Sequence, residues 1–415
     1  MSLFKIKSGI LSLVDKVNQV AEPFEPFTRA IIMPPGEAVS PSRIDQLAKY
    51  YSEQMRDFIV EEGHLYIYSN PNDLGDLCIW QGVYTGMLCM KAKASGTSES
   101  RIGAMLAMRG LLMHSEDRLL RGVTTIDPSI FIYRPDGSKG RQYWVGTDYR
   151  LRREDASLDS LAGWIYGVAC AIRHLDVDDL TMNRISSYAK KFMSDGFRLL
   201  NRDGSVTTHG DIRPGFFQAP VRNLAAVCMA RLCHFSPVTN IWRNYASRYK
   251  QDFTRTETHV LWKHGYYNDN VAILLGAAYL MLTDSWDPGH DEAKEGLRIL
   301  ANKQKNAGNA FLIYLCKSLG IELEQRQYQI ADQVLGEFSL AGYSKHPGVV
   351  RNSLDSHIKK VEWGGKQYAA QPLPIWRRPP QDFHWQRNPY QLDDGTDNCY
   401  NGLDFLAAYW ARKLS

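Results

Sequence analysis

The sequence predicts an all-α protein folded as an (α/α)6 toroid, a ring of six helical hairpins, and three observations lead to this prediction. Helical periodicity covers most of the 415 residues. Helices with one polar face alternate with helices that are apolar all round, the pattern of an outer ring wrapped around a buried inner ring. The apolar helices are rich in Gly and Ala, which lets helix backbones approach closely. We expect an N-terminal arm over 1–39 and a single toroid domain over 40–415, with insertions at 121–156 and 344–398.

The twelve expected helices form outer and inner partners. The helices expected to keep a polar face span 40–60, 98–114, 180–200, 238–253, 291–303 and 322–338. The helices expected to be buried span 77–94, 158–172, 219–233, 270–282, 309–319 and 401–413. The Ser-Pro-Ser run at 40–42 supports the first helix start, because Ser caps helices and Pro suits the first turn. Two β-like runs around the Pro-Asp-Gly at 135–137 predict a hairpin in the first insertion.

Charge and cysteine content exclude several classes of protein. The net charge is only +4 and no basic run is long, so we do not expect a nucleic-acid partner. The seven cysteines lie mostly in apolar helical stretches without metal-ligand spacing, so we expect buried thiols in a reducing compartment, and no metal or cofactor. No apolar run reaches the roughly 18 residues of a membrane span, and the start lacks a signal-peptide pattern. We expect a cytoplasmic or non-classically exported protein, or a component of a larger particle, whose oligomeric state stays open.

The functional prediction starts from the loops that precede the inner helices. Because these helices all begin at one end of a toroid, the loops before them converge on one mouth. Polar and aromatic residues fill these loops at 72–76, 121–156, 209–213, 263–269 and 344–398. Concave sites with a few placed polar groups are the usual position for a ligand. We therefore expect the functional site at this mouth.

Carboxylates at the mouth are the candidate catalytic groups. Asp159 lies in the first turn of an inner helix, and an inward-facing carboxylate usually needs a functional reason. Its partner is left open between Asp76 and either Asp394 or Asp397, and Asp155 is a further catalytic candidate; each has an alternative role as a helix cap or dipole charge. For Asp155 the capping or loop role is slightly favoured. His209 is a candidate base, with a structural turn as the alternative.

At this point the sequence resembles the six-hairpin glycosidases, which include unsaturated glucuronyl and rhamnogalacturonyl hydrolases. The resemblance rests on the alternating helices, on the W-x-G of Trp80 and Gly82 near an inner-helix start, and on the acids of D-A-S-L-D at 155–159. It covers most of the chain as architecture and selects no single family, because the hairpin insertion and the segment 376–390 depart from it. It implies that sugars are cleaved or isomerised at the mouth. Related toroids are polysaccharide lyases and sugar epimerases.

The expected ligand is a polysaccharide or oligosaccharide. Aromatic rings stack on sugar faces and arginines fork onto carboxylates. The candidate substrate-binding residues are Trp80, Arg152, Arg213, Tyr267, Trp376, Arg378 and Trp385. For the segment 376–390 the alternative is a structural lid packed on the barrel, and for Tyr267 it is packing.

The leading hypothesis is a glycoside hydrolase that cleaves a complex or acidic polysaccharide through Asp159 and a second Asp. One alternative is a polysaccharide lyase or sugar epimerase with His209 or Tyr267 as base. Another is a non-catalytic glycan-binding or scaffold toroid. The D-D-x-x-D at 393–397 resembles the magnesium motif of helical terpene synthases, but its Gly and Thr favour a loop, so we predict no metal there.

Overall fold

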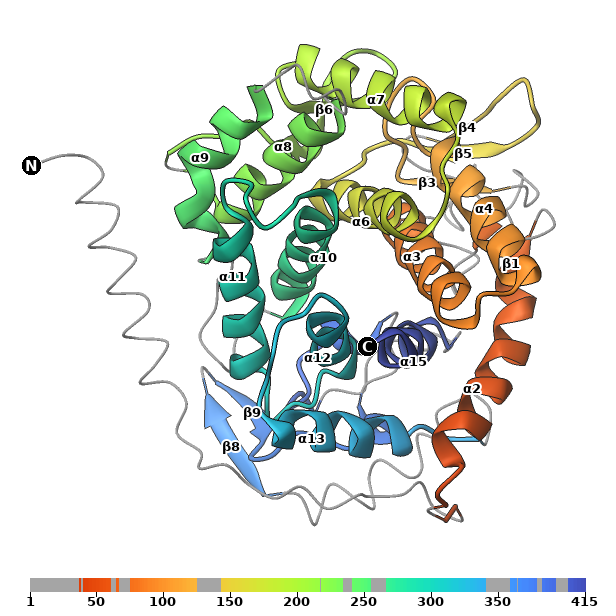
Figure 1. The fold of residues 1–415 in the computed structure, drawn as a ribbon, viewed down its shortest axis with the longest axis vertical. Coiled ribbons are helices and arrows are strands. Elements are labelled where there is room, and N and C mark those ends of the chain that lie inside the picture. Colours follow the sequence, from red (N-terminus) through yellow and green to blue (C-terminus); the bar gives the residue numbers. More distant parts are fainter. Residues whose placement is uncertain are drawn as a thin grey trace, which may run out of the picture.

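The structure is a computed structural model that describes residues 37–38, 40–60, 65–66, 75–124, 143–216, 218–233, 241–254, 266–340, 359–363, 365–378, 383–392 and 402–415. Within these ranges the chain forms twelve α-helices and a few small antiparallel sheets (Figure 1). The prediction of a mainly helical protein is confirmed. The predicted arm over 1–39 lies outside the described residues except for 37–38.

Six helices keep one polar face, as predicted. They are α2 (Arg43–Gln54), α4 (Ser98–Met113), α7 (Asp179–Ser194), α9 (Ile241–Phe253), α11 (His290–Lys303) and α13 (Gln325–Gly336). On α7 the buried residues are Ile185, Tyr188, Ala189 and Phe192, a single stripe at helical spacing. Asp178 caps this helix by accepting a hydrogen bond from the backbone N–H of Thr181 at 2.7 Å. Such a helix is stable only with its stripe against other helices.

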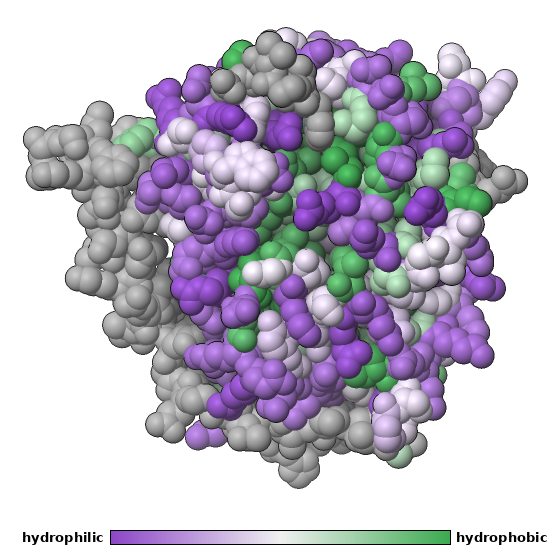
Figure 2. Space-filling view, in the orientation of Figure 1, coloured by the Kyte–Doolittle hydropathy of each residue, from purple (hydrophilic) through white to green (hydrophobic). Residues whose placement is uncertain are grey.

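The other six helices are buried on nearly all sides. They are α3 (Leu77–Ser95), α6 (Leu158–His174), α8 (Pro220–Cys233), α10 (Tyr266–Leu282), α12 (Ala310–Ser318) and α15 (Leu403–Leu414). Figure 1 shows most of them around the middle of the molecule, with the amphipathic helices outside. Helix α3 packs against α6 and α15, α6 against α10, and α12 against α15, while α8 lies against α6 and α10. In the same orientation, Figure 2 shows apolar residues near the middle of this face and hydrophilic residues around it.

Glycines set the separation of α3 and α6. A Cβ atom on Gly82 would lie 1.9 Å from the carbonyl oxygen of Gly163, and one on Gly163 would lie 2.4 Å from the Cα of Ile79. Only a hydrogen atom fits at either position. The prediction that small residues allow the inner helices to approach closely is confirmed at this pair.

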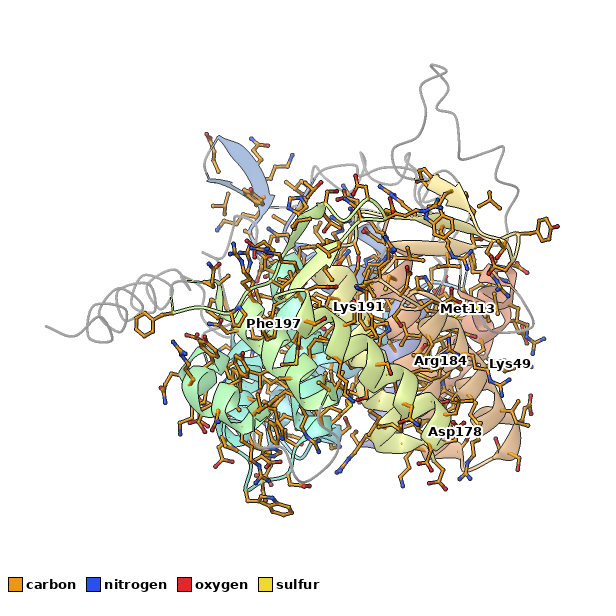
Figure 3. All side chains as sticks on the ribbon, turned by 90° about the horizontal axis from the view of Figure 1, so that it is seen from above. Lys49, Met113, Asp178, Arg184, Lys191 and Phe197 are labelled. Carbon is orange, nitrogen blue, oxygen red and sulfur yellow. The ribbon has the colours of Figure 1, made fainter. Side chains whose placement is uncertain are left out.

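The strands form small antiparallel sheets between the helices. The two-stranded sheets pair β1 (Ile59–Val60) with β2 (Leu65–Tyr66), β6 (Arg198–Leu200) with β7 (Val206–Asp211), and β8 (Lys360–Trp363) with β9 (Lys366–Ala369). A three-stranded sheet has the order β3 (Gly122–Thr124), β5 (Leu151–Arg153), β4 (Tyr143–Val145). Figure 3 shows the blue β8–β9 strands and the yellow β4–β5 strands on the same side of the molecule. Strand β5 leads into α6, and the start of α3 lies beside β3, so the starts of these two helices lie next to the three-stranded sheet.

Two predicted helices were too long. The helix expected over 40–60 ends at Gln54 and continues as a short 3-10 turn, η1 (Met55–Phe58), before strand β1. The helix expected over 180–200 ends at Ser194, because Gly196 and Phe197 adopt left-handed backbone conformations with φ of 70° and 60° that turn the chain into β6. Glycine reaches that conformation at little cost, whereas a phenylalanine there is strained.

Two loop predictions also changed. The stretch 209–213, expected as a loop, begins within strand β7. In the predicted hairpin of the first insertion, the second run forms β4, which pairs with β5, while the first run and the Pro-Asp-Gly turn lie outside the described residues. The six cysteines in the described part of the chain are buried and free: Cys78, Cys89, Cys170, Cys228, Cys233 and Cys316.

Candidate functional site

Asp159 lies in the first turn of α6 and is only 6% exposed. The hydroxyl of Ser157 donates a hydrogen bond to its Oδ1, and the hydroxyl of Tyr267 donates one to its Oδ2. The helix itself is capped by Ser157 and Ser160, which form a capping box, so Asp159 is not needed as a cap. Each of its oxygens accepts one hydrogen bond, so two donors hold the carboxylate in position.

Asp76, directly before α3, and Arg121, directly before β3, form an ion pair beside this group. The Nη2 of Arg121 lies 3.3 Å from the Oδ1 of Asp76. The same guanidinium donates to the carbonyl oxygen of Gly75 and, at 3.5 Å, to that of Asp155. Both side chains keep some solvent exposure, 21% for Arg121 and 29% for Asp76. Arg121 therefore ties the N-terminus of α3 to the segment that leads into α6.

The four side chains influence one another electrostatically. Burial, followed by the negative charges of Asp159 and Asp76, raises the pKa of Tyr267 far above its usual value of 10, and Arg121 opposes this rise only weakly. For Arg121, burial lowers the pKa, but the charges of Asp76 and Asp159 outweigh it, so the pKa is raised overall. The phenol of Tyr267 is therefore a hydrogen-bond donor at neutral pH. We call Asp76, Arg121, Asp159 and Tyr267 the carboxylate cluster.

Three members of the carboxylate cluster were predicted from the sequence, each from a different loop. The structure brings Asp76, Asp159 and Tyr267 together at the N-terminal ends of α3, α6 and α10. Sequence reasoning missed Arg121, although this residue opens the first predicted insertion. A cation near these acids could have been expected, because buried acids at a shared mouth require a cation or hydrogen-bond donors to offset their burial.

Asp155 has the loop role that the sequence left open. Its backbone is left-handed, with φ of 62°. Its N–H donates to the Oδ1 of Asn201 at 3.2 Å, and its own Oδ1 accepts from the N–H of Thr208 at 2.7 Å. These bonds fasten the β6–β7 hairpin to the segment before α6. Asp155 thus shapes the approach to Asp159.

Arg152 and Arg213 were predicted to bind substrate, but both are held by carboxylates within the protein. Arg152 places its two Nη atoms 2.5 and 2.7 Å from the carboxylate oxygens of Asp148, and these hydrogen bonds lower the pKa of Asp148 strongly. Arg213 forks onto Asp211 at 2.8 and 2.6 Å, which lowers the pKa of Asp211 to about 2. These interactions assign Arg152 to the β3–β5 sheet and Arg213 to a surface ion pair.

His209 lies on β7 with its side chain exposed. Among the described contacts, no hydrogen bond joins it to Asp159 or Tyr267. The structure therefore does not place His209 in the carboxylate cluster.

The aromatic segment of the second insertion packs into the core. We call residues 375–378 and 383–387 the plug segment; it contains the 3-10 turns η3 (Ile375–Arg377) and η4 (His384–Gln386). Trp385 is 2% exposed, and its indole N–H donates to the carbonyl oxygen of Asp404 at 2.7 Å. Arg378, also 2% exposed, donates to the carbonyl oxygens of Leu373 and Ala307 at 3.0 and 2.9 Å.

Trp80 belongs to the same packing, since its ring lies 5.0 Å from that of Phe383 and it is buried. Trp376 is half-buried against the core. The expectation that Trp80, Arg378 and Trp385 contact a sugar is corrected, because side chains enclosed by protein cannot reach a ligand at the surface. The arrangement matches the alternative of a structural lid.

The plug segment also places a buried acid beside a histidine. Asp404, at the start of α15, is 1% exposed and has its Oδ2 3.8 Å from the Nε2 of His384. Burial raises the pKa of Asp404 to about 7, although backbone N–H donors, including that of Phe405 at 2.8 Å, work against the rise.

No group of three or more His, Cys, Asp or Glu side chains within the described ranges is arranged to hold a metal ion. Asp397 and the rest of the D-D-x-x-D at 393–397 lie outside those ranges. In the part of the chain that the structure covers, no helix is both long and apolar enough to cross a membrane. Comparisons with protein-family models, with curated proteins and with solved structures found no match.

Proposed function

We propose that the helices form an (α/α)6 toroid. The alternation of buried and amphipathic helices along the chain supports this proposal, as do the contacts of α3 with α6 and of α15 with both α3 and α12. The contact of the last helix with α3 is the one that a closed ring requires.

We propose further that the chain is a glycoside hydrolase that uses the carboxylate cluster. The observation that carries this proposal is the meeting of Asp159 and Asp76, from different helices, with a tyrosine donor and an arginine. Glycosidic hydrolysis needs two carboxyl groups across the scissile bond, about 5 to 5.5 Å apart for retention and about 6.5 to 9.5 Å apart for inversion.

The hydrogen bonds suggest a division of roles. Asp159, which accepts from Ser157 and Tyr267, is suited to act as the base or nucleophile, because those donors hold its oxygens in a fixed position. Asp76 is the second carboxyl group in this scheme. To protonate a leaving oxygen it must first carry a proton, so bound substrate has to weaken its ion pair with Arg121. Asp397 stays the other candidate for this acid.

The lyase and epimerase alternative has less support. A phenolate at Tyr267 would lie beside two carboxylates, and its pKa is raised rather than lowered. The exposed His209 lacks a described contact with the carboxylate cluster.

The non-catalytic alternative has one specific observation in its favour. The plug segment fills the space between α3, α10, α12 and the buried end of α15 with Phe383 and Trp385. A protein whose central space is filled with side chains can still bind a glycan at the rim, beside the partly exposed Tyr267.

The test is a panel of neutral and acidic polysaccharides incubated with the whole chain. We expect new reducing ends without the ultraviolet absorbance of an unsaturated uronic acid, and at least about 100-fold slower release by Asp159→Asn, the usual lower range for a lost acid or base. Asp179→Asn, an exposed carboxylate on α7, is the matched control and should keep wild-type activity. Full turnover by Asp159→Asn would refute its catalytic role. Ultraviolet-absorbing products would identify a lyase, and binding without cleavage would identify the non-catalytic protein.

A further inference from the structure

A cavity lined by several charged side chains lies outside the carboxylate cluster, between α7, β6 and the segment 117–119. Its volume is about 140 Å³. Since a water molecule takes about 30 Å³ of liquid volume, there is room for a charged substituent of several heavy atoms. The charged side chains that line the cavity are Asp117, Arg118, Lys191, Asp195, Arg198 and Arg202. In Figure 3, Lys191 lies near the end of α7 that leads towards Phe197 and β6.

Both carboxylates of this cavity are already paired. Asp117 lies 2.6 Å from the Nη2 of Arg118, whose hydrogen bond lowers the pKa of Asp117. Asp195 lies 3.1 Å from the Nζ of Lys191. Two of the four cations are therefore neutralised by the two acids that line the cavity.

Arg198 and Arg202 are the remaining cations. In the described part of the chain neither guanidinium has a carboxylate within ion-pair distance. Asp211, which pairs with Arg198 across the β6–β7 sheet, has its carboxylate held by Arg213. Glu154, the other nearby acid, accepts its described hydrogen bond from the backbone N–H of Arg202 and not from the guanidinium.

Arg202 is also held in position. Its guanidinium lies 4.9 Å from the centre of the Trp144 ring, a cation–π contact that leaves its N–H donors available. Trp144 in turn lies against Arg152, which the bond to Asp148 fixes. A fork of donors held by an aromatic ring is the arrangement that binds carboxylate and sulfate groups well.

The cavity is connected to the carboxylate cluster through the β6–β7 turn. Asn201, which lines the cavity, accepts a hydrogen bond from the N–H of Asp155, four residues before Asp159. Leu119, another lining residue, is two residues before Arg121. The cavity therefore borders the segments that lead to Asp159 and to Arg121.

We propose that this cavity is an oxyanion-binding site that takes a carboxylate or sulfate group through Arg198 and Arg202. The site requires no catalytic role for Asp159, so it stands or falls separately from hydrolysis. The group can be a free ion or a substituent of a larger ligand such as an acidic oligosaccharide.

The experiment titrates the full chain at low ionic strength with sodium sulfate, with a galacturonate oligomer and with a neutral oligosaccharide of the same length. We expect the wild-type protein to bind at least one of the two anions, and the double variant Arg198→Ala/Arg202→Ala to bind it at least tenfold more weakly. The matched control is Arg101→Ala/Arg184→Ala, which removes two exposed arginines on α4 and α7 that do not line the cavity. The control should stay within twofold of wild type.

The outcomes separate the sources of the anion. A loss of sulfate binding identifies a site for free oxyanions, and a loss confined to the oligomer identifies a site for a substituent of a larger ligand; both support the proposal. An equal loss in the control, or no binding of either anion by wild type, overturns it. If the double variant does not fold, Arg198→Gln/Arg202→Gln keeps the aliphatic stems and the same expectations apply.

Discussion

The contact between α3 and α6 gives the most direct test of the helix arrangement. In Gly82→Ala, the new methyl group would lie 1.9 Å from the carbonyl oxygen and 2.3 Å from the carbonyl carbon of Gly163. Both are backbone atoms, so no side-chain rotation relieves the clash and the two helices must separate. Overpacking a core costs about 1 to 3 kcal/mol, and a backbone obstacle belongs at the upper end of that range.

A gain in helix propensity partly offsets this cost. Replacing Gly by Ala in a helix interior stabilises by about 1 kcal/mol, so the expected net loss for Gly82→Ala is about 2 kcal/mol. Gly103→Ala on α4 is the matched control, because a methyl group there meets nothing within 4 Å. It should gain about 1 kcal/mol, which makes the difference between the two variants about 3 kcal/mol.

The assay is urea denaturation of the two variants and wild type, followed by circular dichroism and tryptophan fluorescence. The midpoint should fall for Gly82→Ala and rise slightly for Gly103→Ala. A Gly82→Ala protein as stable as Gly103→Ala would refute the packing of α3 on α6 and, with it, the proposed ring.

Three further predictions test the buried acid, the plug segment and the carboxylate cluster. The pKa of Asp404 is raised from 3.8 to about 7, so between about pH 4 and 7 the folded protein keeps a proton that the unfolded chain releases. The free energy of unfolding should therefore fall as the pH rises through this window, by at most about 4 kcal/mol. Asp404→Asn should make the free energy of unfolding nearly independent of pH across the same window. Trp385→Ala should lower the free energy of unfolding by about 3 to 5 kcal/mol and the half-buried Trp376→Ala by clearly less; equal small losses in urea titrations would contradict our placement of the plug segment in the core. Tyr267→Phe removes a donor from the buried Asp159 and should cost about 1.5 to 3 kcal/mol, whereas Tyr149→Phe, at an 86% exposed position, should cost nothing measurable in the same titration.

Periodicity predicted the helices well and their ends less well. The buried helices were recognised because they have no polar face and contain runs of small residues. Helices α3, α6, α8 and α15 begin and end within two residues of the expected bounds. The helix expected to continue to residue 200 ends early because Gly196 and Phe197 are both left-handed. Glycine after a helix is an ordinary stop signal, which the prediction passed over, whereas a left-handed phenylalanine is not announced by residue type. Short strands such as β6 and β7 were missed because pairing with each other, and not alternation along either strand, stabilises them.

The candidate site was predicted in part, for a similar reason. Asp76, Asp159 and Tyr267 could be predicted because each directly precedes or opens a buried helix, and topology brings those starts together. The role of Arg152 could not be predicted, because an arginine that binds Asp148 and an arginine that binds a sugar acid have the same local sequence. The same holds for Trp385, whose burial depends on the rest of the fold. The contacting residue decides between the two roles, and that contact exists only in the folded chain.

The contacts of α15 set conditions on how the chain folds. Tyr409 donates to the carboxylate of Asp45 at 2.9 Å across 364 positions of sequence, and α15 packs against α2 and α3. During synthesis one apolar side of α3 therefore stays exposed to solvent until α15 has been synthesised. Native contacts between residues so far apart in sequence slow folding, and they prolong the time for which apolar surface is exposed to solvent. We expect newly made chains to depend on chaperones, and chains that end before residue 402 to aggregate rather than to form a smaller stable protein.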